Sequence, residues 1–114
     1  MGFGETDDDL AVIFKTLQDY QVEGIVVNFY THVNGTPCLS RAMTPENVLR
    51  RLAQLRIVFP STSLILGGGR RQWLEETCLK ETFQIVDTLY ARSFLNHPNP
   101  YWLRESEILT SIGF

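Results

Sequence analysis

Apolar residues follow two spacings in turn along the chain, one typical of helices and one typical of buried strands. A first helix is predicted over residues 7–20, where apolar side chains recur every three or four positions. These side chains are Leu10, Ile13, Phe14 and Leu17. The run from Gly24 to Tyr30 is almost continuously apolar, which suits a strand of a parallel sheet covered on both faces. The chain therefore opens with a helix followed by a buried strand.

The same alternation continues to the end of the sequence, with proline and glycine marking its boundaries. The later elements are predicted to be a helix from Pro45 to before Pro60, a strand over 63–66, a helix over 72–79, a strand over 85–90 and a helix over 100–110. Residues 81–85 could equally extend the third helix. Thr44 and Asn99 each stand before a proline, and we predict that both cap the helix that follows.

The helix after Thr44 is predicted to bury one stripe and to expose another. The expected buried positions are Val48, Leu52 and Leu55, with Leu49 as a further candidate. The solvated positions are expected to be Arg50, Arg51 and Arg56. Charged side chains at such spacing normally mark the face of a helix that meets water.

The order of elements is typical of an α/β protein with a parallel sheet. About three parallel strands alternate with four helices, and we interpret them as a single domain over residues 1–114. In such folds, ligand sites lie in the loops that follow the carboxyl ends of the strands. Three loops are placed there: Gly2–Glu5, the residues from Asn28 onward, and Gly67–Arg71.

The residues before the first helix have the pattern of a strand end that runs into a helix. Gly2 and Gly4 allow a tight turn and a close backbone approach. Thr6 is predicted to be the N-cap, with Asp9 closing a capping box. Such a loop normally follows a strand, and only Met1 stands before it. We therefore expect the fold to need a further strand at this point.

Composition and charge restrict the classes of function. The 114 residues are 44% hydrophobic, and the net charge of −3 argues against a nucleic-acid surface. No apolar run approaches the ~20 residues of a membrane span, so the expected location is the cytoplasm. Cys38 and Cys78 are too far apart in the sequence to resemble a metal motif, and His32 with Cys38 gives two ligands where three or four are needed. No metal site is predicted.

Taken together, the strand-end loops resemble a known family. The sequence contains, in order, GFGET, VVNFYTHVNGTP, LAQLRIVFP and LILGGGRR, and it ends in VDTLYARSFLNHPNP and ILTSIGF. These segments resemble, in order and spacing, the C-terminal part of biotin synthase and its radical S-adenosylmethionine relatives. The resemblance covers essentially the whole chain. It implies a partial (β/α)8 barrel, a fold that typically has ~250 residues, with this chain forming the C-terminal half-barrel.

The resemblance also implies roles for single residues. Those matching positions beside S-adenosylmethionine are Gly2, Gly4, Glu5, Phe29 and Tyr30. Those matching positions near the substrate are Asn28, Gly69 and Arg70. The Asn28 amide could hold a carbonyl or ureido group by hydrogen bonding, and it could equally tie down its own loop.

Two departures from the family pattern limit what this chain can do. The CxxxCxxC motif that holds a [4Fe-4S] cluster is absent, and two cysteines cannot replace it. The resemblance therefore implies S-adenosylmethionine and [4Fe-4S] as cofactors, but no catalytic residue on this chain. Ile65 stands where the family has an arginine that ligates an auxiliary [2Fe-2S] cluster, which makes that second cluster doubtful.

Three hypotheses remain open on the sequence alone. The first is a half-barrel that supplies cofactor and substrate walls and that pairs with the missing N-terminal half or with itself. It could be an excised fragment, a truncated gene product or one subunit of a split enzyme. The second is a non-catalytic α/β module that binds a small anion or a protein partner, with Gly67–Arg71 as the anion site. The third is a small α/β domain whose resemblance to the family is accidental.

Overall fold

The computed structural model describes residues 1–38, 43–74, 76–91 and 100–114. Four α-helices alternate with three strands in this part of the chain. In order they are α1 (Asp7–Asp19), β1 (Gly24–Val27), α2 (Pro45–Val58), β2 (Ser63–Leu66), the 3₁₀-helix η1 (Arg70–Gln72), α3 (Glu76–Ile85), β3 (Thr88–Leu89) and α4 (Trp102–Ser111). These alternating helices and strands confirm the predicted α/β class.

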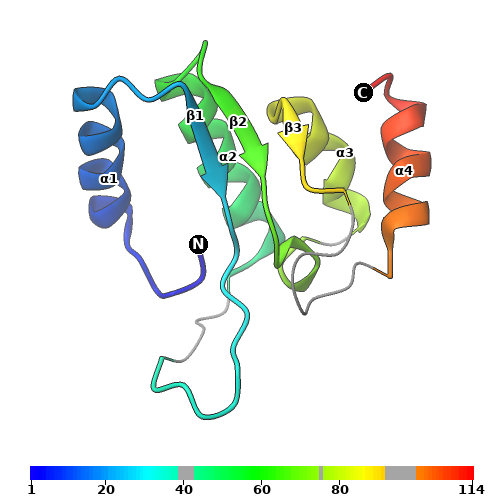
Figure 1. Cartoon of the computed structure of the whole chain (residues 1–114), viewed down its shortest axis with the longest axis horizontal. Helices are drawn as coiled ribbons and strands as arrows, with labels where there is room; N and C mark the ends of the chain where they lie inside the picture. The colour runs from blue at the N-terminus through cyan, green and yellow to red at the C-terminus, as the bar shows by residue number, and fades with distance from the viewer. Residues whose placement is uncertain (39–42, 75, 92–99) are drawn as a thin grey trace.

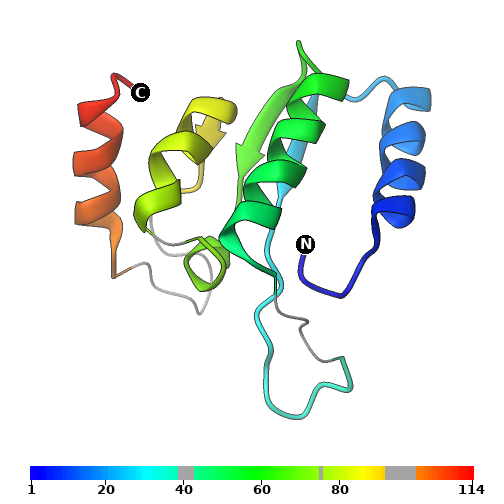
Figure 2. The ribbon, with the colours of Figure 1, turned by 180° about the vertical axis from the view of Figure 1, so that it is seen from behind.

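The three strands form one sheet in the order β1-β2-β3, and both pairings are parallel. Ile25 lies opposite Leu64 in the first pair, and Ile65 lies opposite Thr88 in the second. Helices α2 and α3 cover one face of the sheet, and no helix of the described residues crosses the other face (Figures 1 and 2). The sheet therefore has one packed face and one open face.

The hydrophobic core lies between the packed face of the sheet and helices α2, α3 and α4. Alternate strand residues point into it, because successive side chains of a strand point to opposite faces. The strand residues of the core are Ile25, Val27, Leu64 and Leu66, each at most 9% exposed. The predicted stripe of Val48, Leu52 and Leu55 on α2 is buried against them. Deep packing thus fixes β1 and β2 in place beneath α2.

Side-chain caps fix the starts of α1 and α2. The Thr6 hydroxyl accepts a hydrogen bond from the Asp9 N–H, and the Asp9 carboxylate accepts one from the Thr6 N–H at 2.7 Å. This is the predicted capping box. The Thr44 hydroxyl accepts from the Asn47 N–H, with Pro45 in the first turn. The helix starts were readable from the sequence because these signals are local.

Several predicted boundaries were wrong. β1 ends at Val27 rather than Tyr30, and β3 comprises only Thr88 and Leu89. The third helix starts at Glu76 rather than residue 72, because Gly69 adopts a φ of 79° and a 3₁₀ turn follows it. The last helix starts at Trp102. The predicted cap Asn99 lies outside the described residues.

The assignment of Arg51 to the solvated face of α2 was wrong. Arg50 is exposed and Arg56 is half-buried, whereas Arg51 is only 8% exposed. An arginine is buried when its guanidinium finds partners, and the N-terminal loop provides them. The periodic pattern could not show this, because the partners come from more than 40 residues away.

None of the helices in the described residues is both long enough and apolar enough to cross a lipid bilayer.

Candidate functional site at the carboxyl ends of β1 and β2

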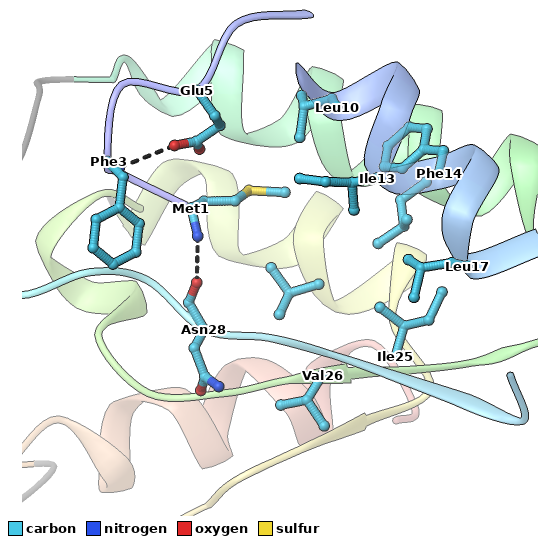
Figure 3. A pocket seen from close by; sticks show the side chains of 12 residues that line it. Met1, Phe3, Glu5, Leu10, Ile13, Phe14, Leu17, Ile25, Val26 and Asn28 are labelled. Atoms are coloured by element: carbon cyan, nitrogen blue, oxygen red, sulfur yellow. Dashed lines mark hydrogen bonds between the residues drawn. The ribbon is translucent and has the colours of Figure 1, made fainter. Parts of the chain in front are cut away.

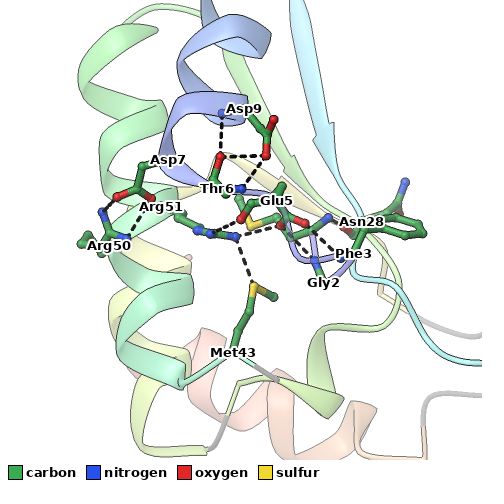
Figure 4. Close-up of polar contacts among 11 residues, drawn as sticks. Gly2, Phe3, Glu5, Thr6, Asp7, Asp9, Asn28, Met43, Arg50 and Arg51 are labelled. Carbon is green, nitrogen blue, oxygen red and sulfur yellow. Dashed lines mark hydrogen bonds and ion pairs between the residues drawn. The ribbon is translucent and has the colours of Figure 1, made fainter. Parts of the chain in front are cut away.

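The N-terminal loop is folded around the carboxylate of Glu5. One carboxylate oxygen accepts a hydrogen bond from the Gly2 N–H and the other accepts one from the Phe3 N–H, both at 2.9 Å (Figure 4). Gly2 and Gly4 have φ values of 104° and 91°, a region that favours glycine. The two glycines therefore allow a turn that Glu5 then holds closed.

Arg51 anchors this loop to α2. Its guanidinium donates to the Glu5 carboxylate and to the Glu5 carbonyl oxygen, both at 2.8 Å, and it also contacts the Met43 sulfur (Figure 4). Burial alone would raise the pKa of the Glu5 carboxyl, but the hydrogen bonds from loop N–H groups hold that pKa below its usual value. Glu5 is therefore ionised at neutral pH and serves as the centre of the loop.

The loop lies beside the residues that continue β1. The Met1 amino group donates to the Asn28 carbonyl oxygen at 2.7 Å, and the Tyr30 N–H donates to the Met1 carbonyl oxygen at 2.8 Å. The Phe3 and Tyr30 rings lie with their centroids 4.4 Å apart. The structure thus brings together the N-terminal loop and the end of β1, which the sequence separates by some 25 residues.

Asn28 bridges the ends of β1 and β2. Its amide oxygen accepts from the Gly68 N–H at 3.1 Å, and a Cβ built on Gly67 would overlap that same oxygen. Because the amide oxygen is the acceptor, the amide NH₂ is left to point at the open face of the sheet, away from the apolar cavity beyond β1 (Figure 3). Asn28 therefore ties down its loop and still presents a donor.

Phe29 and Tyr30 differ in their surroundings, as alternate residues of an extended chain do. Phe29 is 5% exposed and belongs to the core, so its side chain does not face the open side. The Tyr30 hydroxyl donates to the Cys38 carbonyl oxygen at 2.7 Å and lies 3.2 Å from the Thr36 hydroxyl. Tyr30 therefore organises the loop after β1. Contact of either residue with a cofactor stays a prediction.

Arg70 lies inside the protein and is paired with Glu105 of α4. The two side chains are 5% and 0% exposed, and their two hydrogen bonds measure 2.7 and 3.1 Å. A third bond runs from Arg70 to the Gly67 carbonyl oxygen. The charge of Arg70 is thus compensated within the fold. Contact of Arg70 or Gly69 with substrate stays a prediction.

The same pairing weakens the case for an anion site at Gly67–Arg71. Arg70 is not directed outward, and the Arg71 guanidinium lies 4.4 Å from the centre of the Tyr101 ring, in a cation–π arrangement. Arg70 is therefore not a free cation at the glycine turn, whereas Arg71 contacts a ring but has two buried guanidinium nitrogens, Nε and Nη1, without a hydrogen-bond partner among the described residues.

The residues present do not fit an iron–sulfur cluster. No three His, Cys, Asp or Glu side chains among the described residues are grouped as metal ligands. The whole sequence has two cysteines, and Cys38 is exposed while Cys78 is half-buried. A [4Fe-4S] cluster needs more thiolates than this chain offers.

Sequence reasoning missed three residues that shape this site: Arg51, Trp73 and Glu105. The Trp73 indole N–H donates to the Tyr30 carbonyl oxygen at 3.3 Å, and the other two form the ion pairs described above. Arg51 was assigned to the solvated face of its helix, and Glu105 was given no role. Arg51 pairs with Glu5, and Glu105 pairs with Arg70. These ion pairs become visible only in the folded structure, because the partners are distant in the sequence.

The fold and the loops together define a class of protein: an α/β protein whose candidate site gathers at the carboxyl ends of parallel strands. The family model described as Biotin and Thiamin Synthesis associated domain matches residues 26–114, and the chain belongs to that family. The predicted resemblance is thereby confirmed.

Curated relatives named biotin synthase match along most of the chain. The one from Streptomyces avermitilis is 28% identical over 99% of this chain, and one from Thermus thermophilus is 26% identical over 99%. The one from Acaryochloris marina is 40% identical over 60% of the chain. The matches cover 29%, 35% and 20% of those relatives, so the chain spans about a third of their length or less.

Proposed function

We propose that the chain forms the C-terminal portion of a biotin-synthase-like radical S-adenosylmethionine enzyme with a (β/α)8 barrel. In this proposal it supplies part of the cofactor and substrate walls, and the part of the barrel that this sequence does not include supplies the cluster motif. The observation that carries the proposal is the meeting of three loops, Gly2–Glu5, Asn28–Tyr30 and Gly67–Gly69, at one end of a parallel sheet with an open face. In a barrel the open face would be the interior.

The N-terminal loop fits the role of a cofactor wall. Gly2 is buried, and a Cβ at this position would lie 3.5 Å from the Tyr30 Cβ and 3.6 Å from the Trp73 ring and the Tyr30 backbone nitrogen, so the loop packs closely on the residues after β1. Glu5 and Arg51 hold the loop in one conformation, so it would be formed before a ligand arrives. A rigid glycine turn with an aromatic pair beside it, Phe3 and Tyr30, suits the flat face of an adenine ring.

Asn28 fits the role of a substrate contact. Its amide oxygen is held by Gly68, which orients the NH₂ group toward the open face. A fixed NH₂ group can donate to a carbonyl or ureido oxygen without a loss of side-chain freedom on binding. Its neighbours on that face, Val26 and Ile65, lie opposite each other in the register and provide apolar walls. This side of the sheet would bind and orient a substrate rather than move protons.

Reductive cleavage of S-adenosylmethionine is the chemistry that a [4Fe-4S] cluster supplies when bound in such enzymes. The residues of this chain do not fit that cluster, so we assign no step of the cleavage to them. In this proposal the residues of this chain shape the site and exclude water from it. We therefore expect no catalysis by this chain alone.

Binding of S-adenosylmethionine tests the proposal. The chain is measured by calorimetry alone and after co-expression with the part of Streptomyces avermitilis biotin synthase that lies outside the match. We expect binding in the co-expressed sample and a loss of about tenfold or more with Gly2→Ala, because a side chain strains the backbone at a φ of 104° and would change the shape of the loop.

The matched control is Gly113→Ala, which has a φ of 72° and open space around it, far from the strand ends. It should leave the affinity unchanged. Absence of binding in the co-expressed sample would reject the proposal, and an equal loss in both variants would show that the Gly2 loop is not the cofactor wall.

A further inference from the structure

Arg71 carries a charge that the described part of the fold does not balance. It follows the glycine turn after β2, and its guanidinium lies 4.4 Å from the centre of the Tyr101 ring. Its Nε and Nη1 atoms are buried and have no hydrogen-bond partner in the part of the chain that the structure describes. Buried polar atoms of native proteins almost always have a partner, because an unpaired donor loses its bonds to water without replacement. This guanidinium therefore indicates an acceptor that comes from outside the chain.

Two other buried arginines show that this property belongs to Arg71 and not to every buried arginine of the fold. Arg70 forms two hydrogen bonds with the Glu105 carboxylate. Arg51 leaves its Nε without a partner, but both of its terminal nitrogens bond to Glu5. Arg71 forms no ion pair within the described residues, and the one electrostatic contact that it makes there is with an aromatic ring.

The ion pair of the preceding residue places Arg71 at the start of α4. The Glu105 N–H donates to the Tyr101 carbonyl oxygen, so Tyr101 lies one helical turn before the carboxylate that Arg70 binds. The 3₁₀-helix η1 and the start of α4 lie at the end of the sheet to which the strands point (Figure 1). With Arg70 held against the first turn of α4, the next residue reaches the ring at the start of that helix.

The start of α4 adds to the positive potential around Arg71. Tyr101 is the N-cap residue, and its side chain forms no capping hydrogen bond. The first N–H groups of a helix have no partner within the helix, and together with the helix dipole they favour an anion. Glu105 is the acidic residue of the first turn, and Arg70 already compensates its charge. The N–H groups of a guanidinium point outward in its plane, so a ring over one face does not block them.

From these contacts we propose that Arg71 and the start of α4 form a binding site for the phosphate group of a small ligand. Two phosphate oxygens pair with one edge of the guanidinium, either Nε with Nη2 or Nη1 with Nη2. The third oxygen faces the N–H groups at the start of α4, and a carboxylate has no third oxygen to offer. The anion lies beside α4 and not in the glycine turn, where Arg70 is already paired. The site goes beyond the proposed function, since neither Arg71 nor Tyr101 belongs to the cofactor and substrate walls.

Titration of the whole chain with inorganic phosphate tests the site, followed by NMR at constant ionic strength with chloride as the compensating anion. We expect saturable shifts of the Arg71 Nε–H signal and of the Trp102 and Leu103 amide signals. Binding should weaken about tenfold or more in Arg71→Met, and acetate should bind about tenfold or more weakly than phosphate. The matched control is Arg50→Met, which removes the same charge from an exposed arginine of α2 and should leave binding unchanged. The absence of saturable shifts, equal affinities for acetate and phosphate, or equal losses in the two variants would overturn the proposal.

Thermal unfolding separates ligand binding from a structural role of Arg71. A buried guanidinium without a partner costs free energy when no anion is bound, so Arg71→Met should raise Tm in phosphate-free buffer. Added phosphate should raise the Tm of the unchanged chain and not that of Arg71→Met, because an anion stabilises only the state that binds it. Arg71→Lys keeps the charge but loses the planar fork, and it should gain less from phosphate than the unchanged chain. A lower Tm for Arg71→Met in phosphate-free buffer would contradict the proposal, since the guanidinium would then support the fold itself. These outcomes are independent of S-adenosylmethionine binding.

Discussion

Replacing Glu105 by alanine is expected to lower the free energy of unfolding by about 3–5 kcal/mol, because it leaves a buried arginine without its counter-charge. Glu105 is 0% exposed and forms two hydrogen bonds with the Arg70 guanidinium. Arg70 in turn holds the Gly67 carbonyl oxygen, so the loss extends to the end of β2. Urea unfolding followed by circular dichroism measures the change.

Two variants give this prediction its control. Lys15→Ala breaks an exposed pair with Asp19 on α1, whose side chains are 78% and 63% exposed, and should cost less than about 1 kcal/mol. The double variant Arg70→Met with Glu105→Leu removes both charges and should recover much of the lost stability. If Glu105→Ala costs no more than Lys15→Ala, the pair does not support the fold as described.

Gly69→Ala is expected to destabilise the protein by about 2–3 kcal/mol, since it combines backbone strain with overlap. Gly69 has a φ of 79°, and a Cβ built on it would overlap the Phe29 carbonyl oxygen, an atom of the backbone that cannot rotate away. The substitution should push the β2 loop away from β1 and so break the bond between Phe29 N–H and the Gly68 carbonyl oxygen. Thermal unfolding measures the effect.

The adjacent residue provides a matched control. A Cβ built on Gly68 meets no atom within 4 Å, and Gly68 has no left-handed φ. Gly68→Ala adds the same methyl group one position earlier and should change stability by less than about 0.5 kcal/mol. Equal costs at the two positions would contradict the view that the close approach of β1 and β2 requires glycine at position 69.

The sequence predicted the parallel α/β fold because its signals are local. Helical and strand spacing, the Thr6 and Thr44 caps and the Gly67–Gly69 turn each involve a few neighbouring residues. The boundaries of β1, β3 and the third helix were missed because they depend on contacts between strands and on the 3₁₀ turn. Contacts of this kind do not change the spacing of apolar residues along the sequence.

The candidate site was predictable only in part, for the same reason. The resemblance placed Gly2, Glu5, Asn28 and Gly69 at strand ends, and the structure does bring their loops together. The buried partners Arg51 and Glu105 come from helices distant in the sequence, and charged residues are assigned to solvent by default. Which charge is buried follows from the fold alone.

If this chain forms one part of a (β/α)8 barrel, the strands that complete the barrel should bind to it. Sedimentation equilibrium tests it most directly, with the purified chain mixed with the part of Streptomyces avermitilis biotin synthase that lies outside the match. We expect a one-to-one complex that is lost when Val26→Pro blocks the edge of β1 that β2 leaves free. Two species that sediment separately at every concentration, with this chain a stable monomer, would contradict it.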